Sequence, residues 1–201
     1  MLQDQFGAID IYLFDQLLRG RIRPGDTIVD CGCGGGRNLV YLLREGFDVY
    51  GVDPNPAAID GVRAMAASVA PRLPADHFRA EPIERSSFPD AFATVAISSA
   101  VLHFARDDAH FEAMLAGTWR LLAPGGLFFC RLASSIGIET QVRQIEGRRH
   151  WLPDGSERYL VDEDLLLRKS VELGGELLDP IKTTVVSGQR SMTTWVLRKV
   201  H

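Results

Sequence analysis

Apolar segments of strand length alternate with amphipathic segments of helix length along most of the chain, from about residue 27 to the end. The apolar segments are continuous runs, which are typical of strands buried on both faces of a parallel sheet. Seven strands are predicted, over residues 27–31, 48–53, 77–80, 94–98, 127–132, 176–186 and 192–199. Helical spacing predicts helices at 9–18 and 37–45, after a cap at Asn55, and at 107–122 and 162–173.

This order predicts an α/β fold with a Rossmann-like, doubly wound, mostly parallel sheet of seven strands that ends in an antiparallel C-terminal hairpin. Because domains typically hold ~100–200 residues, we expect a single domain over residues 1–201. Residues 1–24 are expected to lay a helix over the core. Between residues 133 and 160 the periodicity lapses around a hairpin-like turn, so this stretch is interpreted as an insertion on the substrate side.

Composition and charge exclude several classes of protein. The chain is 46% hydrophobic and 24% charged, as globular proteins are, and its net charge of −4 offers no cationic field for nucleic acid. With no apolar run of roughly 18 residues and no basic leader, we expect no membrane contact and a cytoplasmic location. Cys31, Cys33 and Cys130 are expected to be reduced thiols. No spacing typical of metal ligands occurs, which predicts no metal.

Candidate chemistry is concentrated where the first predicted strand runs into a loop rich in glycine, Gly32-Cys33-Gly34-Gly35-Gly36. Glycines directly after a strand let a ligand approach the backbone, because no Cβ intervenes. Gly32 and Gly34 match the first two glycines of the dinucleotide fingerprint, but Arg37 stands at the third, where a small residue is needed. The loop predicts a nucleotide-like ligand and leaves its identity open.

Two acidic residues narrow the choice of ligand. Asp30 lies just before Gly32 and is expected to face the crevice at the carboxyl edge of the sheet, where it would repel a pyrophosphate. It would attract an ammonium or sulfonium, since a charge pair at 4 Å gains about 4 kcal/mol at an effective dielectric of ~20 before desolvation costs. S-adenosylmethionine has that charge. Asp53 ends the next strand and can accept hydrogen bonds from ribose hydroxyls, a contact that NAD would use equally.

With these residues in place, the sequence resembles the class I S-adenosylmethionine-dependent methyltransferases. The resemblance spans about residues 25–132 and rests on Asp30-x-Gly32-x-Gly34-x-Gly36 as motif I, on Asp53, and on the turn Leu122-Ala123-Pro124-Gly125-Gly126. Within that class, the branch that contains tellurite-resistance methyltransferases is most similar in its motifs. That narrower resemblance rests on Gly32–Asn38, Gly46–Val49 and Gly51–Asp53.

The resemblance implies roles for individual residues in holding the cofactor. Asp30 and the backbone from Gly32 through Cys33 to Gly34 would lie near its methionine moiety, and Asp53 would bind its ribose. The other implied cofactor contacts are Arg37, Asn38, Glu81, Ile83 and Ser98, of which Glu81 and Ile83 are the candidates beside the adenine.

Three residues are candidates on the acceptor side. His103 stands in a segment that resembles the one facing the transferred methyl group, and it is interpreted as a base or as hydrogen-bonded scaffolding. Arg131 ends the strand at 127–132, where it would bind an anionic substrate or pair with a neighbouring acid. Tyr12 would cover the site from the N-terminal helix or pack in the core. His103 is the candidate catalytic residue, and Tyr12 and Arg131 are the candidate substrate-binding residues.

The resemblance therefore implies methyl transfer from S-adenosylmethionine to a small-molecule acceptor by in-line displacement, with S-adenosylhomocysteine as the product. An NAD-dependent oxidoreductase stays open as an alternative, consistent with Asp53 but opposed by Asp30 and Arg37. A non-catalytic module that only binds S-adenosylmethionine is the third possibility. Methylation of adenine bases is disfavoured, since Ser98-Ser99-Ala100-Val101 stands where such enzymes have an Asn/Asp-Pro-Pro-Tyr/Phe segment.

Overall fold

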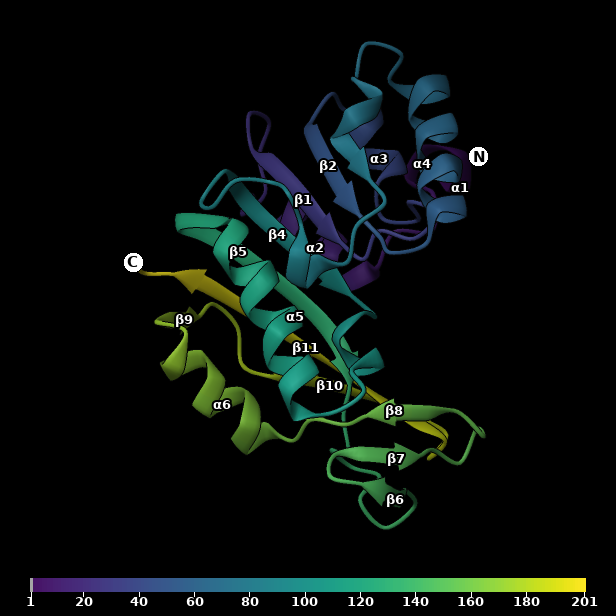
Figure 1. Ribbon diagram of the computed structural model, residues 1–201, viewed down its shortest axis with the longest axis vertical. Coiled ribbons are helices and arrows are strands. Elements are labelled where there is room, and N and C mark those ends of the chain that lie inside the picture. The colour runs from purple at the N-terminus through teal and green to yellow at the C-terminus, as the bar shows by residue number, and fades with distance from the viewer. Residues whose placement is uncertain (1) are drawn as a thin grey trace.

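The computed structural model describes residues 2–201 and is built around one large sheet (Figure 1). Its strand order is β3-β2-β1-β4-β5-β11-β10, with the short β9 also paired to β11. The strands from β3 to β5 pair in parallel, whereas β11 is antiparallel to both β5 and β10, so the predicted Rossmann-like sheet with its C-terminal hairpin is confirmed. The strands of the sheet are β1 Thr27–Cys31, β2 Asp48–Val52, β3 Phe78–Arg79, β4 Ala93–Ser99, β5 Leu122–Ala133, β9 Gly175–Leu177, β10 Lys182–Val186 and β11 Arg190–Lys199.

Helices cover both faces of this sheet, as continuous apolar strands require. One face packs against α2 Ile11–Leu18, α3 Val40–Arg44 and α4 Pro56–Val69, and the other against α5 Asp108–Leu121 and α6 Glu163–Glu172. The remaining helical segments are short: α1 Leu2–Phe6 and the 3-10 turns η1 Ala75–His77, η2 Ile83–Arg85 and η3 Leu102–Phe104. No helix within residues 2–201 combines the length and the apolar character needed to cross a bilayer.

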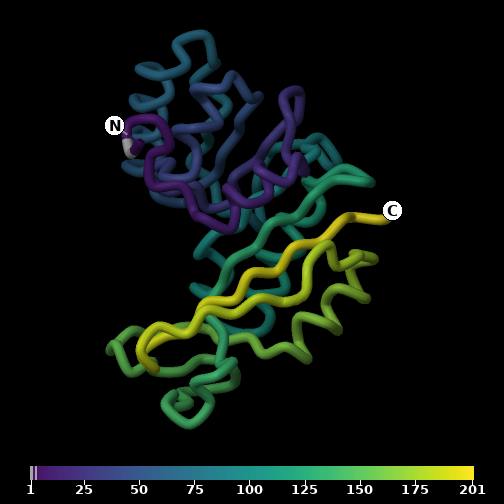
Figure 2. Tube along the Cα trace, turned by 180° about the vertical axis from the view of Figure 1, so that it is seen from behind, coloured from purple at the N-terminus to yellow at the C-terminus, as the bar shows by residue number. Residues whose placement is uncertain are grey.

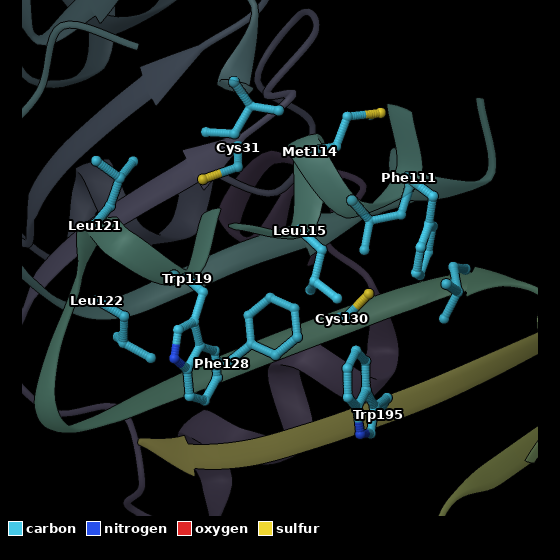
Figure 3. Close-up of a cluster of buried hydrophobic side chains, with 14 of the residues drawn as sticks. Cys31, Phe111, Met114, Leu115, Trp119, Leu121, Leu122, Phe128, Cys130 and Trp195 are labelled. Carbon is cyan, nitrogen blue, oxygen red and sulfur yellow. The ribbon is translucent and has the colours of Figure 1, made fainter. Parts of the chain in front are cut away.

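The core beneath α5 is built on aromatic rings (Figure 3). The ring of Phe128 lies edge-to-face with Trp119 and with Trp195, at centroid distances of 5.8 and 5.4 Å. Trp195 is fully buried, and its indole N–H donates to Oγ of Ser170 at 3.0 Å, so burial leaves no unpaired donor there. This packing holds β5 against β11, and the carboxyl end of β5 carries the candidate residue Arg131.

Capping residues set the starts of the longer helices. Asn55 accepts from the amide of Ala57 at the start of α4, and Asp107 and Asp162 do the same at the starts of α5 and α6. These helices lie close to their predicted ranges. The helix predicted from residue 37 begins only at Val40, because residues 37–39 continue the glycine loop and Leu39 offers no side-chain cap.

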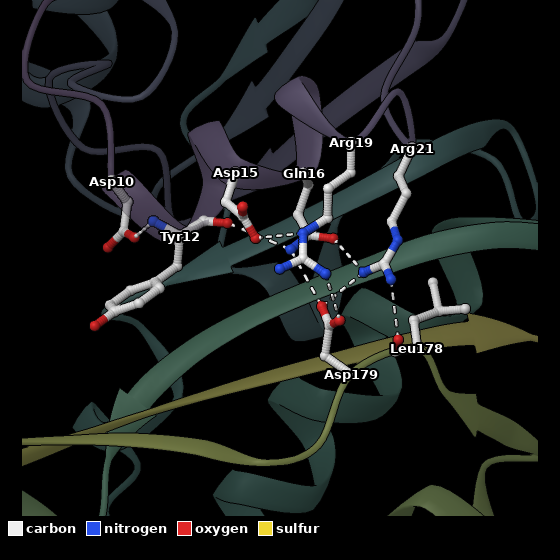
Figure 4. A network of polar contacts seen from close by, with 8 residues as sticks. All are labelled: Asp10, Tyr12, Asp15, Gln16, Arg19, Arg21, Leu178 and Asp179. Atoms are coloured by element: carbon white, nitrogen blue, oxygen red, sulfur yellow. Dashed lines mark hydrogen bonds and ion pairs between the residues drawn. The ribbon is translucent and has the colours of Figure 1, made fainter.

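The strand predicted over residues 176–186 is interrupted, which corrects that expectation. It forms β9 and β10, separated around Asp179 and Pro180, and proline lacks the N–H that a continued strand would need. At this break the Asp179 carboxylate turns to the N-terminal segment, where it accepts from Arg21 at 2.6 Å, Arg19 at 3.1 Å and Gln16 at 3.3 Å (Figure 4). Asp179, in the segment that separates β9 from β10, thus anchors α2 to the C-terminal hairpin.

Residues 143–159 form a separate three-stranded antiparallel sheet where the sequence predicts an insertion. Its strands are β6 Arg143–Glu146, β7 Arg149–Trp151 and β8 Glu157–Tyr159, and the β7–β8 connection occupies the predicted hairpin turn. Figure 2, seen from behind, shows this green sheet projecting beyond the end of the long β5–β11 pair, far from the N-terminal helices. The division of the chain into a core, an N-terminal helix and an insertion stays a prediction.

Candidate functional site

The glycine loop after β1 has a shape that depends on missing side chains. Gly32 has φ +86°, and a Cβ there would lie 2.4 Å from Cγ2 of Val101. Gly34 also has a positive φ, +51°, but its Cβ position is open. Only glycine fits at Gly32, whereas the space above Gly34 is free for a ligand.

Asp30 lies at the end of β1 beneath this loop and is 1% exposed. Burial raises the pKa of its carboxyl to about 7, the nearby Arg37 cation lowers it, and Asp53 raises it. A carboxylate in this position gains from a cationic ligand, because desolvation otherwise penalises its charge.

Asp53 follows β2 and is fixed by two amides. Its Oδ2 accepts from Gly34 N at 3.0 Å, and its Oδ1 accepts from Asn55 N at 2.9 Å. Each oxygen retains a lone pair for a hydroxyl of a ligand. The backbone amides of Gly32 and Cys33 both donate to the carbonyl of Val52, at 2.8 and 3.0 Å. The backbone amides of Gly32, Cys33 and Gly34 therefore all donate to groups at the end of β2 and are not free for a ligand.

The side chains of the other loop residues predicted to contact the cofactor point in different directions. Cys33 is 5% exposed, burial raises the pKa of its thiol, and its backbone N–H and carbonyl are paired with Val52 and Gly36, so a cofactor contact by Cys33 stays a prediction. Arg37 crosses to the end of β4, where Nη2 donates to Oγ of Ser99 at 3.0 Å. Asn38 accepts from the amide of Asp10 at 3.0 Å and is 3% exposed, so it joins the N-terminal segment to the loop.

A cleft of about 630 Å³ opens beside the loop. Among the residues that line it are Gly32, Asp53, Ile83, Val101 and Met114. Its size suits a cofactor or a small molecule. Ile83 thus lines the cleft, and its contact with an adenine stays a prediction.

Glu81, the other residue predicted beside the adenine, does not belong to the cleft lining among residues 2–201. Its carboxylate instead accepts from N and Oγ of Ser87, both at 2.7 Å. Burial alone would raise the pKa of Glu81, but these two bonds outweigh burial and lower it.

At the end of β4, neighbouring serines face opposite sides of the sheet. Ser98 is fully buried on the α5 side, and its Oγ has no hydrogen-bond partner among residues 2–201. Ser99 faces Arg37. The alternation of side chains along a strand turns Ser99 toward Arg37 and Ser98 to the other side, and a cofactor contact by Ser98 stays a prediction.

His103, in η3, is 5% exposed. Its Nδ1 accepts from the backbone N–H of Ala133 at 3.1 Å, which leaves the proton of the neutral ring on Nε2. Burial, followed by the positive charges of Arg158 and Arg131, lowers its pKa to about 3. The contacts of this ring fit a hydrogen-bond donor better than a base, and the catalytic role stays a prediction.

The two predicted substrate-binding residues contact the N-terminal segment and the C-terminal hairpin. Arg131 Nη1 lies 3.0 Å from Oδ2 of Asp10, so the neighbouring acid considered for Arg131 is present. The Tyr12 hydroxyl is 2.7 Å from Oγ1 of Thr184, and the cations of Arg131 and Lys182 lie 5.4 and 5.3 Å from its ring centre. Both residues therefore lie near the end of β5, and binding of substrate by them stays a prediction.

Sequence reasoning missed Asp10, although its position just before α2 is a cap signal and its carboxylate accepts from Tyr12 N. It also missed Arg158, which lies in the aperiodic insertion, where no sequence signal indicates its position. Cys31, Cys33 and Cys130 are free and buried. Across residues 2–201 no three His, Cys, Asp or Glu side chains are grouped to hold a metal ion, and the absence of a metal stays a prediction.

Comparison with known proteins identifies the family to which this chain belongs. Residues 29–130 match the methyltransferase domain family. The chain is 31% identical over 134 residues to a malonyl-[acyl-carrier protein] O-methyltransferase of Serratia marcescens, covering 65% of this chain and 49% of that protein. It is 31% identical to a ubiquinone biosynthesis O-methyltransferase of Methylobacterium, covering 75% of this chain and 59% of that protein. The chain thus spans about half the length of these curated relatives.

Solved structures share the fold at lower sequence identity. A SAM-dependent methyltransferase of Methanosarcina mazei superposes with TM-score 0.74 at 19% identity, covering 92% of this chain and 97% of that one. A 1,6-didemethyltoxoflavin-N1-methyltransferase of Burkholderia thailandensis, solved with S-adenosylhomocysteine, gives 0.72 at 20% identity, covering 100% and 81%.

The fold and the motif at Asp30 and Gly32 are those of the class I S-adenosylmethionine-dependent methyltransferases. Within that class, the chain belongs to the methyltransferase domain family, and S-adenosylmethionine is the methyl donor that this class uses.

Proposed function

We propose that this chain transfers the methyl group of S-adenosylmethionine to a small-molecule acceptor by in-line displacement. The observation that carries the proposal is the buried Asp30 carboxylate under a glycine loop that is open above Gly34. The positively charged amino group of the cofactor would balance the negative charge of this carboxylate, and the open space above the loop backbone would accommodate it.

The residues present fit the whole cofactor. Asp30 would hold its ammonium, and Arg37, whose guanidinium donates to the Ser99 hydroxyl, would hold its carboxylate. Asp53, fixed by two amides, would take the ribose hydroxyls. Ile83 would pack against the adenine from the wall of the cleft.

When bound, S-adenosylmethionine supplies a methyl group activated by its sulfonium. The chain then needs no nucleophile of its own, and its task is to align the acceptor and exclude water. His103, with its proton on Nε2, would donate a hydrogen bond to the acceptor and orient it. A base matters only for an acceptor that keeps its proton late in the transfer.

The loop geometry weighs against the dinucleotide alternative. Loops that bind pyrophosphate point free backbone N–H groups at it. Here the amides of Gly32, Cys33 and Gly34 are already used by Val52 and Asp53, and Asp30 adds a negative charge. NAD would meet few donors and a repulsive carboxylate.

The alternative in which the chain binds S-adenosylmethionine without transferring its methyl group needs its own test, because one structure of similar fold is named a [4+2]-cyclase, SpnF, rather than a methyltransferase. The membership of the tellurite-resistance branch also stays a prediction, resting on the motif from Gly32 to Asn38. Both questions concern what happens after the cofactor has bound, so binding and turnover have to be measured separately.

The experiment is calorimetry with S-adenosylmethionine, S-adenosylhomocysteine and NAD, followed by detection of S-adenosylhomocysteine formed with a panel of metabolites. We expect the first two ligands to bind, NAD not to bind, and product to appear only with an acceptor. Uptake of NAD without uptake of S-adenosylmethionine would overturn the proposal, and binding without product across the panel would favour the non-catalytic module.

A further inference from the structure

A second cavity, of about 420 Å³, lies between η3 and the insertion sheet. We call it the hairpin pocket, and it is lined by His103, Phe104, Ala105, Arg106, Arg149, Glu157, Arg158 and Tyr159. Phe104 and Arg106 also line the cofactor cleft, so the two cavities adjoin at these residues. A molecule in the hairpin pocket lies next to the cleft in which the cofactor is proposed to bind.

The hairpin pocket is positively charged in a chain whose net charge is −4. Of its three arginines, Arg149 forms an ion pair with Glu157, the one acid among the lining residues. Arg158 donates to the backbone carbonyl of Glu157 at 2.6 Å, and neither Arg158 nor Arg106 forms an ion pair with a carboxylate among residues 2–201. Two cations of the pocket therefore form no ion pair with a carboxylate in the described part of the chain.

Arg158 lies beside Phe104, another residue that lines the pocket. Its guanidinium carbon lies 4.8 Å from the ring centre of Phe104, which is 58% exposed. The acid whose pKa Arg158 lowers is Asp154, an exposed side chain already bound to Ser156. Burial is the main cause of the lowered pKa of His103, and the positive charge of Arg158 adds to it. Phe104 adds a flat apolar surface beside these charges.

We propose that the hairpin pocket is the acceptor subsite, and that the acceptor is a small organic anion whose carboxylate or phosphate is bound by Arg158 and whose body packs on Phe104. This proposal rests on the proposed methyl transfer and names its substrate class. Arg158 offers a planar fork of donors that matches either anion, and Arg106 adds a second positive charge at the entrance from the cofactor cleft.

The test titrates benzoate, phenyl phosphate and the neutral benzamide into protein saturated with S-adenosylhomocysteine, whose binding is measured first for every variant. We expect at least one anion to bind about tenfold or more tightly than benzamide, since a bond to a charged group typically contributes that much. Tighter benzoate indicates a carboxylate acceptor, and tighter phenyl phosphate indicates a phosphate.

Three variants make the assignment specific. Arg158→Gln is expected to weaken binding of the anion about tenfold and to leave benzamide unchanged. Arg143→Gln removes the same charge from an exposed position on β6 that lines neither cavity, so it should change nothing. Glu157→Gln releases Arg149 from its partner and should strengthen binding of the anion.

The outcomes separate the two proposals. If benzamide binds as tightly as both anions, if neither anion binds, or if Arg158→Gln keeps wild-type affinity, the anionic subsite is refuted while methyl transfer stands. If the wild-type protein does not bind S-adenosylhomocysteine, the proposed function fails first and the subsite fails with it.

Discussion

Oδ2 of Asp10 lies 3.0 Å from Nη1 of Arg131, in an ion pair whose side chains are only 3% and 21% exposed. The pair joins the segment before α2 to the carboxyl end of β5. Asp10 also donates its backbone N–H to Asn38, next to the glycine loop. One residue thus links the N-terminal segment to both sides of the candidate site, and loosening it should affect the cofactor cleft.

A double-mutant cycle on this pair should therefore show strong coupling. Asp10→Asn keeps the oxygen that caps α2 and removes the charge, and Arg131→Gln removes the other charge. We expect a coupling of about 1–3 kcal/mol in the free energy of unfolding, measured by urea, because few water molecules screen the pair. The exposed pair of Arg19 and Asp15 is the matched control, expected at about 0.3–0.5 kcal/mol. Equal coupling in the two pairs would contradict a structural role for Asp10.

The glycine loop predicts a difference between two alanine variants. Gly32→Ala adds a side chain where φ is +86° and Val101 is 2.4 Å away, whereas Gly34→Ala meets a similar φ with open space. We expect Gly34→Ala to cost about 1–2 kcal/mol of unfolding free energy from the backbone alone, and Gly32→Ala to cost about 1–3 kcal/mol more from overpacking.

The clash at Gly32 can be isolated by removing its partner. In the background of Gly32→Ala, Val101→Ala should recover most of the extra cost in urea unfolding, although Val101→Ala alone should destabilise the protein. Purely additive effects of the two substitutions would show that the contact seen at 2.4 Å does not limit this position.

Much of the fold could be predicted because its signals are local. The apolar run at Thr27–Cys31 is β1 residue for residue, since Asp26 and Gly32 bound it on either side. Asn55 caps its helix as predicted. The break between β9 and β10 had a local signal in Pro180, but the contacts that stabilise it come from Arg19 and Arg21, about 160 residues away in the chain, and gave no local signal.

The candidate site likewise contains some residues that could be predicted from local sequence signals and others that could not. Asp30, Gly32 and Asp53 could be predicted because strand ends and tight loops place their side chains by short-range geometry. Asp10 meets Arg131 across 121 positions of sequence, and only the sheet order brings them together. The hairpin pocket depends on an insertion with no periodicity, so the sequence carried no signal for Arg158.

The effect of replacing His103 on the unfolding free energy should depend on pH. With a folded pKa of about 3 and an unfolded pKa near 6.5, the unfolded chain binds a proton in this window that the folded ring does not. The unfolding free energy contributed by the neutral ring is therefore complete above about pH 6.5 and is lost as pH falls, by up to about 1.4 kcal/mol per pH unit.

His103→Asn removes the titration and keeps an oxygen for the amide of Ala133, so its difference from wild type should shrink steadily between pH 7 and pH 4 in urea unfolding. His103→Leu also removes the titration but leaves that amide unpaired, which should cost a further ~1–3 kcal/mol at every pH. If the wild-type and Asn variants show parallel pH curves, the ring titrates normally and its depressed pKa is wrong.

The contribution of Asp30 to the unfolding free energy should have the opposite pH dependence. Replacing Asp30 should also affect stability and cofactor binding in opposite directions. Its carboxyl has a folded pKa of about 7 and an unfolded value near 3.8, so between these values the folded protein holds a proton that the unfolded chain does not. The unfolding free energy therefore falls as pH rises through this window. At pH 8 Asp30→Asn should stabilise the ligand-free protein by about 2–4 kcal/mol, because it removes a buried charge.

The same substitution should weaken the binding of S-adenosylhomocysteine by about tenfold or more in calorimetry at pH 8, since the ammonium loses its charged partner. In the wild type, affinity should rise with pH up to about pH 7 as Asp30 ionises, and then level off, whereas the variant should show no such rise. Asp15→Asn, which neutralises a half-exposed surface carboxylate on α2, is the control expected to leave the affinity unchanged and to alter the unfolding free energy by no more than about 0.5 kcal/mol. An Asp30→Asn variant that binds with wild-type affinity at pH 8 would separate this carboxylate from the cofactor.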